Sequence, residues 1–211
     1  MITVSAFRQV PPFAQGLVRD LRVRWALNEA GLAYRARLLE SGEQTSPAYR
    51  ALQPFGQVPA FEEDGLTLFE SGSIVLHIGA RSETLLPSDP RDRAHAITWV
   101  FAALNTIEVV VQQLASLDLF FADQDWARQQ RPGVEKRVRL RLSELTARLA
   151  DQQYLEGRFS AGDLVMTTVL RILRHTQLVE EYPALHAYQT RCEARPAFQL
   201  ALAEQLGAFQ S

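Results

Sequence analysis

The feature that most constrains this chain is a hairpin signal enclosed by a Val-Pro pair and a Glu-Ser pair, in the stretch FGQVPAFEEDGLTLFESGS at residues 55–73. Two short apolar runs flank Asp64 and Gly65, a dipeptide typical of tight turns between antiparallel strands because it tolerates positive φ. Pro59 stands at the start of the first run, where its missing N–H does not interrupt a strand. A helical pattern begins at the Glu-Ser pair. The stretch therefore predicts a β-hairpin that leads directly into a helix.

The segments before the hairpin alternate between strand and helix patterns. The run ITVSAF at residues 2–7 is β-like, and a second β-like run follows in AYRARLLE. Between them, LVRDLRVRWALNEAG has apolar residues at helical spacing and stops at Gly31, a residue type common just beyond helix ends. The predicted order is β-α-β, an irregular or helical piece, and then β-β-α.

The segments after the hairpin are predicted to be helical. A linker leads to Asp89 and Pro90, which fit an N-cap and the first helical position. Beyond them, apolar residues recur every three or four positions: Ile97, Phe101, Leu104, Ile107, Val111 and Leu114. Ser160 and Asp163 fit reciprocal caps at the start of a later helix.

This change of pattern predicts two domains. We expect an α/β domain at residues 1–82, a linker at residues 83–90 and an all-helical domain at residues 91–211. A chain of 211 residues is long enough for a real hydrophobic core.

The charge balance argues against two classes of partner. The 24 acidic and 22 basic residues leave a formal net charge of -2, so we expect neither nucleic acid nor an anionic membrane as a partner. The longest apolar stretch, at residues 99–121, is interrupted by polar side chains, which makes crossing a bilayer costly. The single cysteine and the scattered histidines predict no disulfide framework and no metal site. We expect a soluble, cytoplasmic protein.

The order of segments and one long motif resemble those of the soluble glutathione S-transferases. The most specific part is GEQTSPAYRALQPFGQVPAFEEDGLTLFESGSIVLHI at residues 42–78, which is similar to the family region with Pro-x-Gly-x-Val-Pro, then Asp-Gly, then Glu-Ser. Weaker support comes from VRWALNEAGL, LEGRFSAGDL and RCEARPAF. The resemblance covers nearly the whole chain. It implies an N-terminal thioredoxin-like domain of order βαβ-α-ββα, followed by a C-terminal helical bundle domain.

The resemblance also implies a glutathione site. In the family the equivalent of Pro59 follows a cis peptide bond, and the N–H and C=O of Val58 face outward, where they can pair with an extended peptide as an added strand would. Glu70 would meet the ammonium of the γ-glutamyl group, and Ser71 would meet its carboxylate. Ser71 also stands at a helix start, whose free N–H groups suit an anion.

The expected contacts to the glycine end of glutathione are less typical of the family. Gln44 and Thr45 stand where some plant members have a His-Lys pair, and Gln57 precedes Val58 as in those members. Neutral groups bind a carboxylate more weakly than charged ones. Arg50 is an alternative source of positive charge.

Activation of the thiol is the main departure from the family pattern. An unperturbed thiol has a pKa of about 8.5, and only the thiolate is a good nucleophile. Tyrosine-type members place a hydroxyl donor at the end of the first strand, where this chain has Phe7. Serine- or cysteine-type members place theirs just before the first helix, where a gapless register gives Asp20. Neither residue donates a hydrogen bond at neutral pH.

A second alignment with the family pattern has a helix that starts at Pro12 and runs on through Asp20, so that Asp20 lies inside it. The site is then lined by the loop before that helix, which makes Arg8 and Gln9 the candidate catalytic residues, with Ser5 on the strand as an alternative. A guanidinium near the sulfur would favour the thiolate by charge.

Two functions follow from the resemblance. The first is a detoxifying enzyme that uses glutathione as co-substrate and adds its thiolate to a small hydrophobic electrophile, with no metal. Isomerisation, dehalogenation and peroxide reduction are variants of it. The second is a non-catalytic glutathione-binding or scaffold protein. The family also implies a symmetric homodimer, for which Phe55 is a candidate anchor if exposed; a place in the core is the alternative for this residue.

Overall fold

The computed structural model describes residues 1–209 and divides into two compact units. The first, called here the α/β unit, comprises Met1–Ser88 together with the segment that begins at Ala194. The second, called here the helical unit, is Asp89–Glu193. Each unit is described below by itself.

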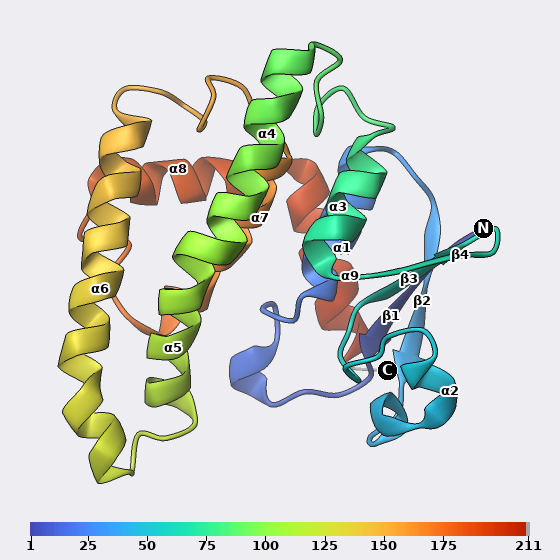
Figure 1. Ribbon diagram of the computed structural model, residues 1–211, viewed down its shortest axis with the longest axis horizontal. Helices are drawn as coiled ribbons and strands as arrows, with labels where there is room; N and C mark the ends of the chain where they lie inside the picture. Colours follow the sequence, from blue (N-terminus) through green and yellow to red (C-terminus); the bar gives the residue numbers. More distant parts are fainter. Residues whose placement is uncertain (210–211) are drawn as a thin grey trace. The chain divides into compact units, whose positions relative to one another are not determined.

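The α/β unit is built on a four-stranded mixed sheet of order β2-β1-β3-β4 (Figure 1). The strand β1 (Ile2–Phe7) pairs in parallel with β2 (Tyr34–Leu39) and antiparallel with β3 (Ala60–Glu63). The last strand, β4 (Leu66–Phe69), pairs antiparallel with β3. The parallel pair requires a crossover connection, which α1 (Asp20–Glu29) supplies.

Helices and short turns complete this unit. They are η1 (Pro12–Ala14), η2 (Glu43–Thr45), α2 (Pro47–Arg50), α3 (Ser71–Gly79) and α9 (Pro196–Ala208). Helix α1 packs against both α3 and α9. The expected thioredoxin-like order of strands and helices is confirmed.

The predicted hairpin is confirmed at β3 and β4. Asp64 has φ 49° and Gly65 has φ 85°, and positive φ at both central residues is the requirement of a two-residue type I′ turn. The turn fixes the register, so Phe61 pairs with Leu68. The side chain of Phe61 is fully buried, which sets this strand in the core of the unit.

The helical unit consists of consecutive helices. They are α4 (Pro90–Ala102), η3 (Ala103–Ile107), α5 (Glu108–Leu119), α6 (Asp125–Leu149), α7 (Ala161–Leu170), η4 (Arg171–His175) and α8 (Pro183–Glu193). The first three form one continuous run because the π-helical turn η3 joins α4 to α5. Asp89 caps α4 through the N–H groups of Arg91 and Asp92, as its sequence predicts.

The buried face of α4 differs from the predicted one. The sequence favours a buried row that includes Phe101, but Phe101 is 52% exposed, and Ala96 and Val100 are buried instead. Helix α7 approaches this part of α4 closely, because a Cβ added to Gly162 of α7 would lie 2.4 Å from the Cβ of Trp99. The small residue that this close approach requires is therefore Gly162, on α7.

The run Pro90–Leu119 is long and apolar enough to cross a membrane by length and composition. Its most apolar window has a mean hydropathy of 1.5, and 33% of that window is buried within the protein. The core helix of a soluble protein also has these properties. The expectation that this stretch does not cross a membrane stays a prediction.

The division into units corrects one expected boundary. A helical domain that extends to residue 211 was expected, but α9 groups with the α/β unit. The ring of Phe198 packs edge-on against Trp25 at 4.8 Å between centroids. Gln205 donates a hydrogen bond of 2.6 Å to the carboxylate of Asp20. These contacts to α1 explain why α9 belongs with the sheet.

The start of α7 has the predicted capping box. One carboxylate, that of Asp163, accepts hydrogen bonds from the N–H of Leu155, from the N–H and hydroxyl of Ser160, and from the hydroxyl of Tyr188, all within 3.1 Å. Burial raises the pKa of Asp163, and these hydrogen bonds oppose that effect. The box therefore joins the segment before α7 to α8.

We predict that Asp163→Ala lowers the free energy of unfolding by about 3–5 kcal/mol, because it leaves several buried donors unpaired at once. The matched control is Asp89→Ala, which removes an exposed cap and should cost about 0.5–2 kcal/mol. Urea denaturation of both variants measures the difference. Equal losses in the two variants would contradict the role given to Asp163.

Candidate functional site

The turn that precedes β3 is held by polar side chains. The amide oxygen of Gln53 accepts hydrogen bonds from the N–H of Phe55 (2.7 Å) and of Gln57 (3.2 Å). Arg50 donates to the carbonyl oxygen of Pro54 at 3.1 Å. Arg50, which the sequence offers as an alternative charge for a ligand, thus supports the turn.

A chain of hydrogen bonds fixes the two ends of the next segment. The N–H of Ala60 donates to Ser5 Oγ at 2.6 Å, and the hydroxyl of Tyr49 donates to the carbonyl oxygen of Gln57 at 2.7 Å. The hydroxyls of Ser5 and Tyr49 lie 2.7 Å apart. Because Tyr49 gives its one proton to Gln57, Ser5 donates to Tyr49. We call this series Ala60–Ser5–Tyr49–Gln57 the hydroxyl chain.

The hydroxyl chain brackets the peptide bond between Val58 and Pro59, which is cis as expected. Among residues 1–209, no hydrogen bond uses the N–H or the C=O of Val58. The side chain of Val58 packs in the core and only 7% of the residue is exposed, but both backbone groups lack a partner within the described residues, as the unpaired groups of an edge strand do.

Ser5 has a structural role within the α/β unit. The residue is buried, and its hydroxyl joins β1 to Tyr49 and Ala60. Burial also raises the pKa of Tyr49, which keeps that hydroxyl a neutral donor. The alternative in which Ser5 serves a thiol would break the hydroxyl chain.

Glu70 and Ser71 lie at the start of α3, as the sequence predicts. Glu70 is the N-cap residue with φ 68° and ψ 112°, and its exposed side chain caps no N–H of the first turn. A non-glycine residue at such angles costs on the order of 1–3 kcal/mol and is often found at functional sites. The uncapped N–H groups at the positive end of the helix can bind an anionic group, and the carboxylate of Glu70 can bind a cationic one. One ligand that carries both kinds of group could therefore use both.

Arg22 is a residue of this site that the sequence did not reveal. It lies on α1 and is 3% exposed, and its Nη1 donates to Ser71 Oγ at 3.2 Å. The sequence does contain a signal that Arg22 is buried. Val18, Trp25 and Ala26 lie three or four positions from it, so they share its side of a helix, and all three are apolar.

The side chain of Asp20 is turned into the protein, away from the loop that precedes α1. The expected helix that starts at Pro12 is wrong: Pro12 begins only the short turn η1, and α1 begins at Asp20. The carboxylate of Asp20 is buried and accepts hydrogen bonds from Arg24 (2.7 Å) and Gln205 (2.6 Å). Burial raises the pKa of Asp20, and the guanidinium of Arg24 opposes this. Asp20 therefore links α1 to α9.

A cavity of about 560 Å³ lies at the carboxyl ends of β1 and β2 and brings several candidate residues together. Its lining is Phe7, Arg8, Gln9, Val10, Pro11, Leu39, Glu40, Ser41 and Gln44. The Nε of Arg8 bonds to Glu40 at 2.6 Å, which offsets part of its charge. The amide oxygen of Gln44 is buried with no partner among residues 1–209. Thr45 donates its hydroxyl proton to the carbonyl of Gly42.

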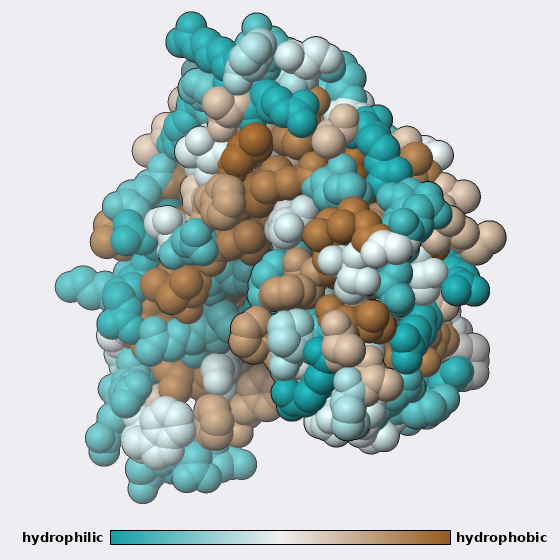
Figure 2. Space-filling model, turned by 45° about the vertical axis from the view of Figure 1, so that its right-hand side comes forward, coloured by the Kyte–Doolittle hydropathy of each residue, from teal (hydrophilic) through white to brown (hydrophobic). Residues whose placement is uncertain are grey.

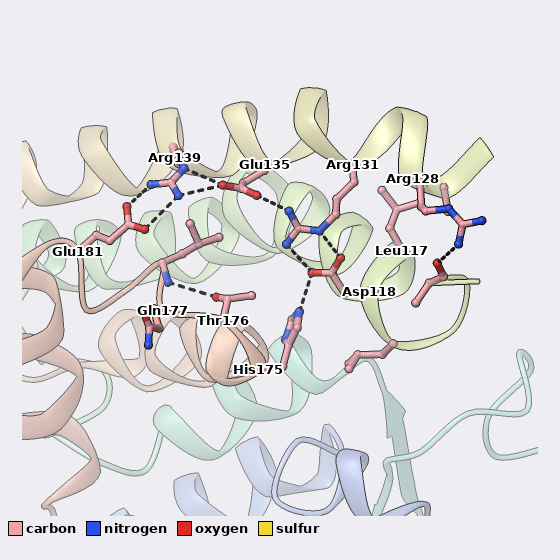
Figure 3. Close-up of a pocket in the computed structure, with 14 residues that line it drawn as sticks. Leu117, Asp118, Arg128, Arg131, Glu135, Arg139, His175, Thr176, Gln177 and Glu181 are labelled. Atoms are coloured by element: carbon pink, nitrogen blue, oxygen red, sulfur yellow. Dashed lines mark hydrogen bonds and ion pairs between the residues drawn. The ribbon is translucent and has the colours of Figure 1, made fainter. Parts of the chain in front are cut away.

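The helical unit has a separate cavity of about 620 Å³. Figure 3 shows a row of alternating charges along its wall. The row consists of Glu181, Arg139, Glu135, Arg131 and Asp118, and the ring of His175 bonds to Asp118 at its end. Each of these charges has an opposite partner beside it, so the row holds α6 against α5 and the segment after η4. Among residues 1–209 no group of three or more His, Cys, Asp or Glu side chains could hold a metal ion.

Comparisons with known proteins identify relatives over most of the chain. Family models for the glutathione S-transferase N-terminal and C-terminal domains match residues 15–80 and 112–196. Glutathione S-transferase 4 of Zea mays is 31% identical over 186 residues, which cover 83% of each chain. A glutathione S-transferase of Hyoscyamus muticus is 28% identical over 184 residues, which cover 78% of this chain and 82% of that one.

Solved structures agree with these relatives. The theta class glutathione S-transferase of Xanthomonas axonopodis pv. citri, with glutathione bound, is 29% identical with a TM-score of 0.79 and covers 95% of this chain and 96% of its own. Glutathione transferase F7 of Populus trichocarpa has a TM-score of 0.83 at 23% identity and covers 98% of this chain and 99% of its own. The second likeness supports the fold alone.

We predict that Tyr49→Phe lowers the free energy of unfolding by about 1–3 kcal/mol, because the carbonyl of Gln57 and the hydroxyl of Ser5 lose a buried partner. Tyr182→Phe is the control, since it removes a single hydrogen bond to the carbonyl of Arg139 in the helical unit. Chemical denaturation compares the two variants. An equal or smaller loss in Tyr49→Phe would show that the hydroxyl chain does not hold the turn.

Proposed function

The chain belongs to the glutathione S-transferase family, and on that premise we propose that it binds glutathione and adds its thiolate to a small apolar electrophile. The observation that carries this proposal is the unpaired N–H and C=O of Val58, beside the cis bond to Pro59, together with Glu70 and Ser71 at the start of α3. The relative from Xanthomonas axonopodis pv. citri, crystallised with glutathione, supports the choice of ligand.

The proposed binding mode uses both ends of the γ-glutamyl group. Its ammonium pairs with Glu70, and its carboxylate accepts from the hydroxyl of Ser71 and from the uncapped N–H groups of α3. The cysteinyl backbone pairs with the N–H and C=O of Val58, as an added strand does. Gln57 and Pro59 line the same turn.

The glycine carboxylate is assigned to Gln44 and Thr45. Gln44 is the stronger of the two, because its amide NH₂ can donate while the hydroxyl proton of Thr45 is engaged with Gly42. Neither residue carries a charge, so this end contributes less than an ion pair would.

Thiol activation is assigned to Arg8 and Gln9, which line the same cavity as Gln44. The guanidinium of Arg8 favours the thiolate by charge, and the amide of Gln9 can donate a hydrogen bond to it. Because Glu40 offsets part of the charge of Arg8, we expect only a modest decrease in the pKa of the thiol.

The alternative function is a non-catalytic glutathione-binding or scaffold protein. Two observations favour it: Phe7 and Asp20 stand where the family usually has its activating donor, and the carboxylate of Asp20 is buried against Arg24 and Gln205. The state of the bound thiol distinguishes the two functions, because only an activated thiol reacts faster than free glutathione.

We also propose a homodimer that acts in the cytoplasm. Phe55 is 64% exposed and stacks edge-on against Phe69, which is 38% exposed. Exposed aromatic residues of this kind are typical anchors of protein interfaces. Figure 2 shows further apolar patches among hydrophilic residues on one face of the protein.

Isothermal calorimetry tests the binding mode. Glu70→Gln should weaken glutathione binding by about 1.5–3 kcal/mol, because the ligand ammonium loses a charged partner. Asp64→Asn removes an exposed carboxylate from the same unit and should leave the affinity unchanged. Unchanged affinity in Glu70→Gln would remove that residue from the site.

Ultraviolet difference titration of bound glutathione tests the chemistry. The wild-type protein should lower the pKa of the bound thiol below its free value of about 8.5. In Arg8→Ala the pKa of the bound thiol should be higher than in the wild type by about one unit or less. The rate of conjugation of an activated aryl halide should follow the same titration. Arg81→Ala, which removes an exposed arginine paired with Glu63, is the control.

The result of this titration separates the two functions. If the wild-type protein leaves the pKa of the thiol unshifted, the transferase mechanism is rejected in favour of the binding protein. If wild type and Arg8→Ala shift it equally, the transferase mechanism stands and Arg8 is not its cause.

Sedimentation velocity tests the dimer. At micromolar concentration the wild-type protein should sediment at about twice the mass of one chain, and Phe55→Ser should shift it toward the monomer, because an exposed anchor is lost. Leu140→Ser, at another exposed apolar residue on α6, should have no effect. A wild-type monomer at this concentration would refute the proposal.

A further inference from the structure

Gln205 is a polar residue of α9 that lies almost entirely out of solvent, with 1% of it exposed. Its side-chain nitrogen donates two hydrogen bonds, one of 2.6 Å to the carboxylate of Asp20 and one of 3.1 Å to the carbonyl oxygen of Val18. An amide NH₂ group has two protons, so Gln205 uses both of them at one place on the chain. That place is the start of α1.

The segment that ends there, residues 8–19 between β1 and α1, is called here the β1–α1 loop. Its first four residues line the cavity to which thiol activation is assigned. The N–H of Arg8 donates to the carbonyl oxygen of Leu39 at 3.1 Å, which fixes the beginning of the loop to β2. Val18 lies near the other end, so Gln205 fixes the end of the loop to α9.

The start of α1 has no local side-chain cap. Its N-cap residue, Arg19, makes no capping hydrogen bond, and such a bond commonly contributes about 1 kcal/mol. The carboxylate of Asp20, in the first turn, accepts hydrogen bonds from Arg24 and from Gln205. A residue far away in the sequence therefore holds a helix start that has no cap of its own.

The other polar and aromatic contacts between α9 and α1 lie further along α1. Phe198 packs edge-on against Trp25 at 4.8 Å between ring centroids, and Glu204 accepts a hydrogen bond of 3.2 Å from Asn28. These contacts hold α9 against the middle and the end of α1. Gln205 differs from them because it reaches a residue that precedes the helix.

We propose that Gln205 is a positioning residue for thiol activation, which fixes the end of the β1–α1 loop and thereby the loop residues that line the cavity. A loop fixed at both ends has fewer conformations than a loop fixed at one end, so release of Val18 gives the loop alternative conformations. A misplacement of about 1 Å in reacting groups can cost about 100-fold in rate.

The inference rests on the proposed function, because it assigns a further residue to the same reaction. It also separates activation of the thiol from binding of the peptide. The proposed binding groups are the backbone of Val58 and the residues Glu70 and Ser71, which lie outside the β1–α1 loop. Loss of Gln205 should therefore slow the reaction and leave the affinity for glutathione unchanged.

The test replaces Gln205, and separately its neighbour Glu204, with methionine, an unbranched apolar side chain that adapts to its surroundings. Gln205→Met removes both donors at the start of α1. Glu204→Met is the matched control on the same helix, because it removes the acceptor of Asn28 and of the Tyr34 hydroxyl. Conjugation of an activated aryl halide gives kcat, calorimetry gives the Kd for glutathione, and ultraviolet difference titration gives the pKa of the bound thiol.

Gln205→Met should lower kcat about fivefold or more and bring the pKa of the bound thiol closer to its free value, with less than a twofold change in the Kd. The amide of Leu17, which donates to the carbonyl oxygen of Ala14 within the loop, should exchange its hydrogen about 10-fold faster. Glu204→Met should lower the stability of the protein and change neither kcat nor the exchange of Leu17.

Equal effects in the two variants would overturn the inference and leave Gln205 as a support of the contact between α1 and α9. An unchanged kcat in Gln205→Met would overturn it as well. If Gln205→Met does not fold, Gln205→Asn is decisive, since it keeps the amide on a shorter side chain that cannot hold both acceptors at these distances. A decrease in kcat of about twofold or more at unchanged Kd supports the inference, and any other result overturns it.

The wild-type protein keeps the two proposals distinguishable. If it binds glutathione but neither lowers the pKa of the thiol nor catalyses conjugation, the proposed function fails, and the inference fails with it. If it is active and Gln205→Met behaves as Glu204→Met does, only the assignment of Gln205 fails.

Discussion

The hydroxyl chain from Ala60 through Ser5 and Tyr49 to Gln57 is the interaction on which the candidate site depends. It joins the centre of the sheet and α2 to both ends of the turn that contains Val58. Each of its hydrogen bonds contributes only about 1 kcal/mol net, but leaving one buried partner unpaired costs about 1–3 kcal/mol. The turn therefore keeps one conformation, and the backbone groups of Val58 stay available to a ligand.

Helix α1 performs two further tasks with buried charges. Its Asp20, paired with Arg24 on the same helix, accepts a hydrogen bond from Gln205 on α9, while Arg22 donates one to Ser71 on α3. Buried ion pairs lose much of their attraction to the cost of desolvation, so stability alone is a weak reason to keep them. The second connection is a hydrogen bond and not an ion pair: Arg22 donates to the hydroxyl of Ser71 and so fixes its position at the start of α3.

Local patterns predicted those parts of the fold that local chemistry decides. The Asp64-Gly65 turn and the capping box at Asp163 were predicted because each depends on residues a few positions apart. The place of α9, the exposure of Phe101 and the role of Arg22 were missed, because each depends on which distant segment packs against it. The proline at position 12 begins only a short turn, since proline favours the first position of any helix without fixing the length that follows.

Amide hydrogen exchange at Val58, followed by nuclear magnetic resonance with and without glutathione, tests the central claim most directly. If glutathione pairs with this turn as an added strand, a concentration 100 times Kd should slow exchange of the Val58 N–H by about 100-fold. The exposed hairpin amide of Gly65 should exchange at the same rate in both samples. Unchanged exchange at Val58, in a sample whose calorimetry shows saturated binding, would contradict the account.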